Sequence, residues 1–73
     1  MEQKAKPIIV QVIIASDDYP SAYTKAAREN GGKYIDYQRT PVHKSLEYHF
    51  RNTSDMVAFK NKISGLNPVD IIE

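Results

Sequence analysis

The sequence predicts an α+β fold, in which a four-stranded antiparallel sheet carries two helices on one of its faces. Three observations predict this fold. The run PIIVQVIIA at residues 7–15 is dominated by β-branched residues, which is typical of a buried central strand. Two segments with helical spacing follow residues that start helices, and each leads into a further strand. The chain of 73 residues is long enough for one domain only, so residues 1–73 are expected to form a single unit.

The first helix is predicted between the segments SDDYPS and GG. The aspartates and serines of residues 16–21 offer capping oxygens, and Pro20 suits the first helical turn because its missing N–H is not needed there. After it, the apolar residues fall within one arc at 100° per residue: Ala22, Tyr23, Ala26 and Ala27. Gly31 and Gly32 are expected to end this helix, since glycine adopts the left-handed conformation without steric cost.

The second half of the chain repeats the pattern of strands around a helix. KYIDYQ at 33–38 is predicted as the second strand, and RTPVHK turns the chain into a third strand, SLEYHFR at 45–51. The second helix is expected to start in NTSDM, with Thr53 or Ser54 as the N-cap. Gly65 followed by Leu66 predicts its end, and a short fourth strand is expected from about residue 69.

The resulting order, βαββαβ, consists of two split βαβ units and predicts the ferredoxin-like arrangement. The expected strand order in the sheet is 4-1-3-2, which places the most apolar strand in the interior of the sheet. Residues 1–6 are expected to be a flexible N-terminal tail.

Alternation along the strands predicts which side chains lie under the helices. Because the covered face should take the more continuous apolar set, Tyr48 and Phe50 are expected in the core. The predicted covered set is Ile8, Val10, Val12, Ile14, Ile35, Tyr37, Leu46, Tyr48, Phe50, Val69 and Ile71. The third strand then shows Glu47, His49 and Arg51 on the open face. Stacking of RNA bases on exposed aromatic residues of this sheet is therefore not favoured.

Isoleucines on the open face predict a contact surface. Ile9 and Ile13 of the first strand are expected there, with Ile72 on the neighbouring edge strand. Contiguous apolar patches on small proteins commonly mark interfaces. The candidate interface is therefore the set Ile9, Gln11, Ile13, His49, Arg51 and Ile72. A homodimer is expected because it would enlarge a small core, and it would form either sheet to sheet or along the edge of the fourth or the second strand.

The residue types argue against catalysis. The chain has no cysteine, and its two histidines, His43 and His49, are too few for a cluster of metal ligands. No serine lies in a nucleophile-elbow pattern. No catalytic, metal or cofactor site is therefore predicted, and the protein is not expected to be an enzyme. Absence of cysteine fits the cytoplasm, and residues 7–15 are too short to span a membrane.

Two resemblances carry further expectations. In the first half, IIVQVIIASDDYPSAYTKAARENGGKYIDYQ is similar to the start of ACT-type regulatory domains, with Asp18, Tyr19 and Pro20 matching that family's turn and Ser21 in place of its glycine. This resemblance implies a small-ligand loop at Asp17, Asp18 and Tyr19. In the second half, LEYHFRNTSDMVAFKNKIS resembles small ferredoxin-like accessory proteins encoded by bacteriophages, through Phe50, Arg51, Asp55, Phe59 and Lys60.

Three functions follow as hypotheses. The leading one is a non-catalytic binding module, a small phage-type accessory or inhibitor protein that binds a host or regulatory protein as a homodimer. The second is an ACT-like regulatory domain that binds a small ligand. The third is a nucleic-acid-binding protein that uses Tyr34, His43, Lys44 and Arg51; a formal net charge of +1 makes it the least favoured.

Overall fold

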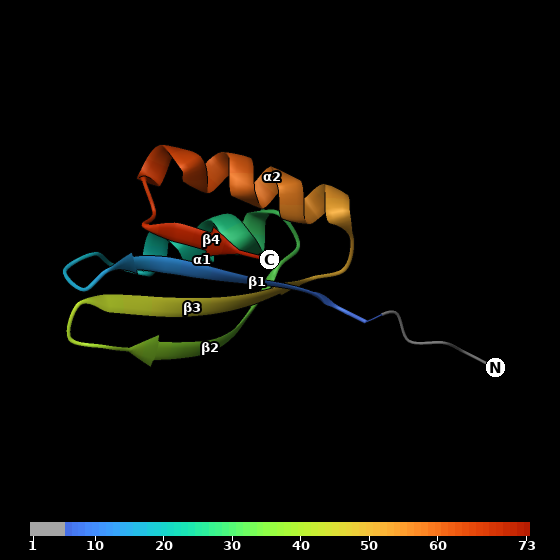
Figure 1. The fold of residues 1–73 in the computed structure, drawn as a ribbon. Coiled ribbons are helices and arrows are strands. Elements are labelled where there is room, and N and C mark those ends of the chain that lie inside the picture. The colour runs from blue at the N-terminus through green and yellow to red at the C-terminus, as the bar shows by residue number, and fades with distance from the viewer. Residues whose placement is uncertain (1–5) are drawn as a thin grey trace.

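The structure, a computed structural model, describes residues 6–73 and consists of one layer of helices on one layer of sheet (Figure 1). The predicted flexible tail, apart from Lys6, lies outside the described residues. The elements follow in the order β1 (Ile8–Ala15), α1 (Ser21–Glu29), β2 (Lys33–Arg39), β3 (His43–Phe50), α2 (Thr53–Ile63), the short 3₁₀ helix η1 (Ser64–Leu66) and β4 (Asp70–Ile72).

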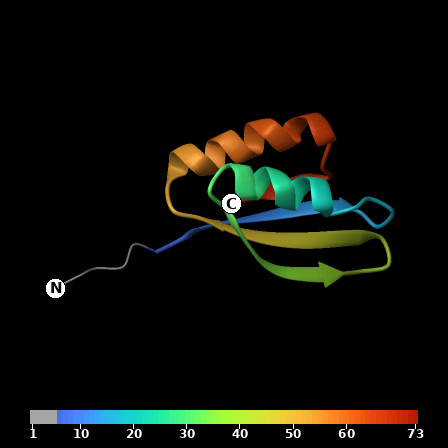
Figure 2. The same cartoon turned by 180° about the vertical axis from the view of Figure 1, so that it is seen from behind.

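The sheet has the predicted topology. Its strand order is β2-β3-β1-β4, and β1 pairs antiparallel with both β3 and β4, while β2 pairs antiparallel with β3. Both helices lie on the same face, as the views from the two sides show (Figures 1 and 2). The βαββαβ, ferredoxin-like prediction is therefore confirmed, including the interior position of the most apolar strand.

The core lies between the sheet and the helices, and it confirms the predicted side of Tyr48 and Phe50. Both rings are at most 1% exposed. Phe59 of α2 packs on them, with ring centroids 5.2 Å from Tyr48 and 5.0 Å from Phe50. The other buried side chains of this cluster are Val10, Val12, Ile14, Tyr23, Ala26, Ala27, Leu46, Met56 and Ile63. Burial of this set drives the helices onto the sheet.

Strand β2 departs from the prediction, because a β-bulge interrupts its alternation. Tyr34 is opposite Tyr48, but the next pair along the strands is Asp36 with Glu47, so Ile35 is the extra residue. Tyr34 and Tyr37 consequently lie on the covered face, where the Tyr34 ring centroid is 5.7 Å from that of Tyr48. The expectation that Ile35 lies under the helices is wrong: it borders a hollow on the open face together with His49.

At the other edge, β4 is shorter than expected. Ile71 is opposite Val12 and packs against the core, as predicted. Val69 precedes the strand and remains 55% exposed, so its expected place in the core is not realised. Its N–H nevertheless donates to the carbonyl of Ile13 at 2.8 Å, which holds the start of the strand against β1.

The ends of α1 fit the prediction only at the C-terminus. Gly31 has a φ of +75°, and the N–H of Gly32 donates to the carbonyl of Ala27 at 2.7 Å, which is the Schellman ending. At the N-terminus, Pro20 occupies the cap position without a side-chain hydrogen bond. The expected capping by aspartate is wrong, because Asp18 accepts from the N–H of Tyr19 at 2.9 Å.

The ends of α2 also differ from the prediction. Asn52 is its N-cap, and the side-chain oxygen accepts from the N–H of Asp55 at 2.9 Å, so neither Thr53 nor Ser54 serves this role. Asn52 can do so because its backbone is extended, which directs the amide oxygen at the first turn. Beyond η1, the left-handed residue is Asn67, with a φ of 56°, and not Gly65.

Candidate functional site

The open face, the face of the sheet opposite the helices, collects the candidate interface residues. Antiparallel pairing places residues that are opposite each other on the same face. Ile9 is opposite His49, Gln11 is opposite Glu47 and Ile72, and Ile13 is opposite Ser45 and Asp70. All of the predicted strand residues therefore share this face, whereas Arg51 lies just beyond the end of β3.

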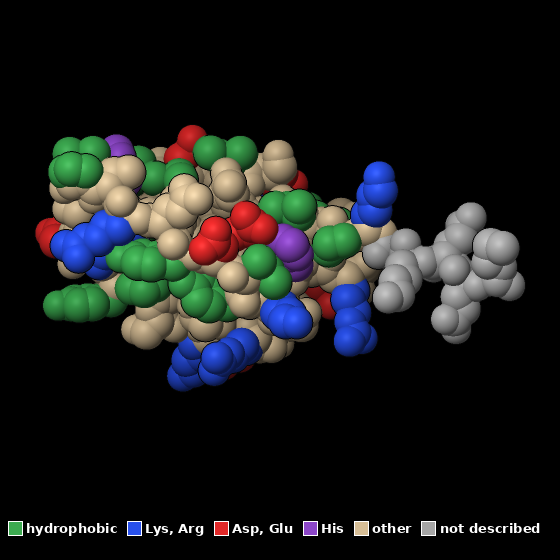
Figure 3. Space-filling model, turned by 90° about the horizontal axis from the view of Figure 1, so that it is seen from below, with side chains coloured by type: hydrophobic (Ala, Val, Ile, Leu, Met, Phe, Trp, Pro, Cys, Tyr) green, Lys and Arg blue, Asp and Glu red, His purple; other side chains and the backbone are tan. Residues whose placement is uncertain are grey.

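Three isoleucines of this face are exposed to solvent. Ile9 is 47% exposed, Ile72 46% and Ile35 42%. Ile13, in contrast, is half-buried. Figure 3 looks onto the open face and shows hydrophobic side chains in separate groups among charged ones. The predicted apolar surface thus consists of separate isoleucines between charged side chains, and the bulge in β2 adds Ile35 to them.

Charge on the open face is separated into two neighbouring groups. The acidic pair consists of Asp36 and Glu47, which are directly opposite each other on β2 and β3. One row nearer to the start of β1 lies the basic end, which comprises Lys6, Lys33, His49 and Arg51. Like charges directly opposite in a sheet are unfavourable, so the acidic pair lowers the stability of the isolated monomer.

His49 links the two groups. Its Nε2 lies 2.7 Å from Oε2 of Glu47, two residues earlier on the same strand and on the same face. This contact fixes the orientation of the imidazole. In residues 6–73, the remaining ion pairs are those of Lys60 with Glu73 and of Lys62 with Glu29. The Lys62 ammonium lowers the pKa of Glu29 and joins α2 to α1.

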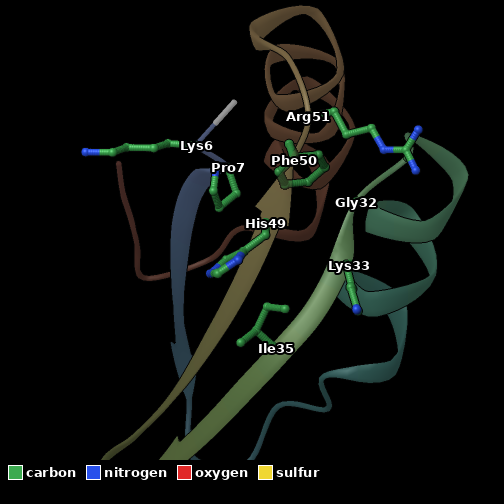
Figure 4. Close-up of a pocket in the computed structure, with 9 residues that line it drawn as sticks. Lys6, Pro7, Gly32, Lys33, Ile35, His49, Phe50 and Arg51 are labelled. Carbon is green, nitrogen blue, oxygen red and sulfur yellow. The ribbon is translucent and has the colours of Figure 1, made fainter. Parts of the chain in front are cut away.

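A hollow of about 620 Å³ occupies the basic end (Figure 4). Three segments that are distant in sequence meet there: the residues before β1, the start of β2 and the end of β3. Lys6 and Arg51 lie at opposite margins, with Pro7, His49 and Ile35 between them. The sequence prediction found His49 and Arg51 but missed Lys6, Lys33 and Ile35. A correct register for β2 would have placed Lys33 beside His49.

The predicted ligand loop lies at the opposite end of β1. Tyr19 is 75% exposed, and the Lys44 ammonium lies 5.5 Å from its ring centroid. Asp18 is used within the chain: its carboxylate accepts from the Tyr19 N–H and from the Tyr23 hydroxyl at 3.3 Å. Asp17 is exposed. A second hollow, of about 500 Å³, borders Tyr19 but neither aspartate.

Tyr23 has the most perturbed acid–base chemistry of the described residues. Burial, with the neighbouring Asp18 carboxylate as the second cause, raises its pKa to about 12. The single hydroxyl proton is shared between the Asp18 carboxylate and the carbonyl of Leu66, whose oxygen lies at 3.2 Å, and this contact connects α1 to η1. This arrangement stabilises a neutral phenol, so Tyr23 serves the packing of the two helices.

In residues 6–73, no group of three or more His, Cys, Asp or Glu side chains is placed to hold a metal ion. Within the same residues, neither helix combines the length and the apolar character that crossing a bilayer requires.

Comparisons with protein-family models, curated proteins and solved structures give no significant match to this chain. The resemblances to ACT-type domains and to small phage proteins stay predictions.

Proposed function

We propose that the protein is a non-catalytic binding module that acts through its open face, and that its first partner on this face is a second copy of the chain. The observation that carries this proposal is the position of the acidic pair directly beside the basic end, with exposed isoleucines around them. A surface with adjacent patches of opposite charge is complementary to itself under a two-fold rotation.

The register of the sheet defines the dimer geometry. Consider a two-fold axis that runs across the strands, midway between the row of Lys33 and His49 and the row of Asp36 and Glu47. Rotation about it places Lys33 of each copy over Asp36 of the other and brings His49 towards the second copy's Glu47. Ile9 then meets the region of the second copy's Gln11 and Ile72, since these two residues are opposite each other.

The energy of this association is modest. Ile9 and Ile72 are each about half exposed in the monomer. Burying the exposed half of either side chain in the dimer contributes about 1 kcal/mol. Ion pairs between the copies add little, but they offset the repulsion within each acidic pair. Because association also costs translational and rotational freedom, we expect a weak and reversible dimer that forms only at high protein concentration.

The apolar contribution is tested by sedimentation velocity over a range of protein concentrations. Ile72→Glu should shift the protein to the monomer, because it places a charge in the apolar contact that Ile72 makes with the region of Ile9 of the second copy. Val57→Glu is the matched control: Val57 is 44% exposed on α2, away from the open face, and this variant should dimerise like the wild type.

The charge contribution is tested by a swap. Lys33→Glu and Asp36→Lys should each weaken the dimer, and the double variant should restore it, because both contacts between residues 33 and 36 are then reversed in sign. A wild-type protein that sediments as a monomer at every concentration, or a swap that fails to restore association, would contradict the proposed geometry.

The alternative of a small-ligand site at the predicted loop has less support. The carboxylate of Asp18 already accepts two hydrogen bonds from the chain itself, and Asp17 does not border the adjoining hollow. A host or regulatory protein as a second partner of the dimer remains part of the proposal, and a pull-down with the wild type and with Ile72→Glu would test whether its capture requires the dimer.

A further inference from the structure

We propose that the hollow at the basic end binds a small, multiply charged phosphate compound, either inorganic polyphosphate or a nucleoside polyphosphate. The inference does not depend on the dimer. It rests on the charges around the hollow, on its apolar floor and on the rigidity of the backbone that positions them.

Positive charge surrounds the hollow. Lys6, Lys33 and Arg51 border it, and no Asp or Glu of residues 6–73 does. None of these three side chains forms an ion pair with a carboxylate of the described residues. They account for three of the chain's ten lysines and arginines, although the net charge is only +1. A compound with several phosphates is the small ligand that matches such a group, and arginine adds bidentate recognition of phosphate oxygens.

The floor of the hollow suits the organic part of a ligand. Pro7 and Ile35 present apolar surface on both sides of the His49 ring, whose orientation Glu47 fixes (Figure 4). A volume of about 620 Å³ lies within the range of about 300–1,000 Å³ that is usual for small-molecule sites. The hollow therefore has room for a nucleoside beside the phosphates.

Backbone packing fixes the positions from which two of the cationic side chains extend. Gly32 passes so close to the Phe50 ring that an added Cβ would lie 2.4 Å from it, so the start of β2 is fixed against the end of β3. Lys33 follows this contact directly, and Arg51 follows Phe50. Lys33 and Arg51 thus extend from fixed backbone positions, and their long side chains can close over a ligand.

Two carboxylates near the hollow limit the affinity. Glu47 is already engaged by His49, and the Asp55 carboxylate lies near Gly31, where an added Cβ would be 2.9 Å from its Oδ2. Because these charges oppose an anion, we expect binding in the range of about 0.1–1 mM at low salt, and weaker binding as salt rises. Lys33 also faces the second copy in the proposed dimer, so the ligand should compete with dimerisation.

The test is a titration of ¹⁵N-labelled protein, followed by amide chemical shifts, with pyrophosphate and ATP in separate experiments. It is run on the wild type and on Ile72→Glu, so that failure of the dimer does not affect the result. Saturable shifts centred on Lys33, Ile35, His49 and Arg51 are expected. Tighter binding of ATP would identify a nucleotide site, and equal binding a polyphosphate site.

Matched variants separate a defined site from general attraction. Lys33→Gln and Arg51→Gln should each weaken binding about threefold to fivefold, which is the effect of one exposed ion pair. Lys25→Gln, which removes the same charge from α1, should leave it unchanged. Equal effects of all three variants, shifts centred on α1, or no saturation by either compound would overturn the proposal. Much tighter binding of single-stranded RNA through the same residues would overturn it as well.

Discussion

The close approach of Gly32 to Phe50 leads to a sharp stability prediction. In Gly32→Ala, the new Cβ would lie 2.4 Å and 2.6 Å from two atoms of the Phe50 ring and 3.0 Å from the carbonyl oxygen of Ala27. Ordinary contacts begin at 3.4 Å, so the overlap with the ring is about 1 Å. The ring cannot move aside easily, because it is 1% exposed and packs on Phe59.

The magnitude follows from two opposing effects. Overpacking a core costs about 1–3 kcal/mol, and the size of this overlap indicates the upper part of that range. Replacing glycine by alanine restricts the unfolded chain and returns about 0.4–1 kcal/mol. The net loss should be about 2 kcal/mol, which lowers the melting temperature by about 10 °C for a domain of this size.

Urea unfolding followed by circular dichroism measures this loss, with Gly65→Ala as the matched control. Gly65 has no atom within 4 Å of an added Cβ, so the same change should stabilise the protein slightly. Adding Phe50→Leu to Gly32→Ala should cost less than the sum of the two single changes, because leucine vacates ring volume. Equal midpoints for Gly32→Ala and Gly65→Ala, or strict additivity, would refute the contact.

Two further predictions concern polar groups. Because the pKa of Tyr23 is raised from 10.0 to about 12, the folded state binds the phenolic proton more tightly than the unfolded state. The protonated Tyr23 therefore stabilises the folded state by up to about 3 kcal/mol relative to the ionised one, and this contribution is complete below pH 10 and is lost as the pH rises towards 12. Urea midpoints at pH 8 and pH 11 should differ less in Tyr23→Phe than in the wild type, and an unchanged difference would contradict this role. Asn52→Ala should cost about 1 kcal/mol in the same assay while Asn52→Asp keeps the cap, whereas a neutral Asn52→Ala would show that Thr53 or Ser54 can take its place.

The sequence was sufficient to predict the sidedness of the central strands. In β1 every second residue from Val10 to Ile14 is apolar, and in β3 the same holds from Leu46 to Phe50. One face of each strand is therefore apolar, wherever the exact ends of the strand are placed. Pairing between two regular strands then preserves this sidedness along their whole length.

The same reasoning failed on β2, where local sequence favours two solutions. Tyr34, Ile35 and Tyr37 can each bury apolar surface. The sequence therefore allows a regular strand with Ile35 and Tyr37 on the covered face, and equally a bulged strand with Tyr34 and Tyr37 there. Tertiary packing selects the bulge, because the Tyr34 ring packs on the buried ring of Tyr48. A strand that alternated regularly, with Ile35 and Tyr37 on the covered face, would place Tyr34 on the other side of the sheet. Since β2 contributes Lys33 and Ile35 to the hollow, this register error also concealed the hollow.

The helix caps were missed for a different reason. Several oxygen-bearing residues stand near each helix start, and only backbone geometry selects among them. Asn52 is extended and reaches the N–H of Asp55, whereas Asp18 is occupied by Tyr19 and Tyr23. Composition predicted that a cap would be present before α2 but could not identify the residue.

The bulge at Ile35 has a consequence for self-association beyond the hollow. β2 is an outer strand, and a regular outer strand offers its free N–H and C=O groups to any other extended chain, which can lead to aggregation. An extra residue distorts this hydrogen-bonding ladder and increases its twist, so a second β2 cannot add in register. Edge-to-edge growth into fibres through β2 is thereby discouraged.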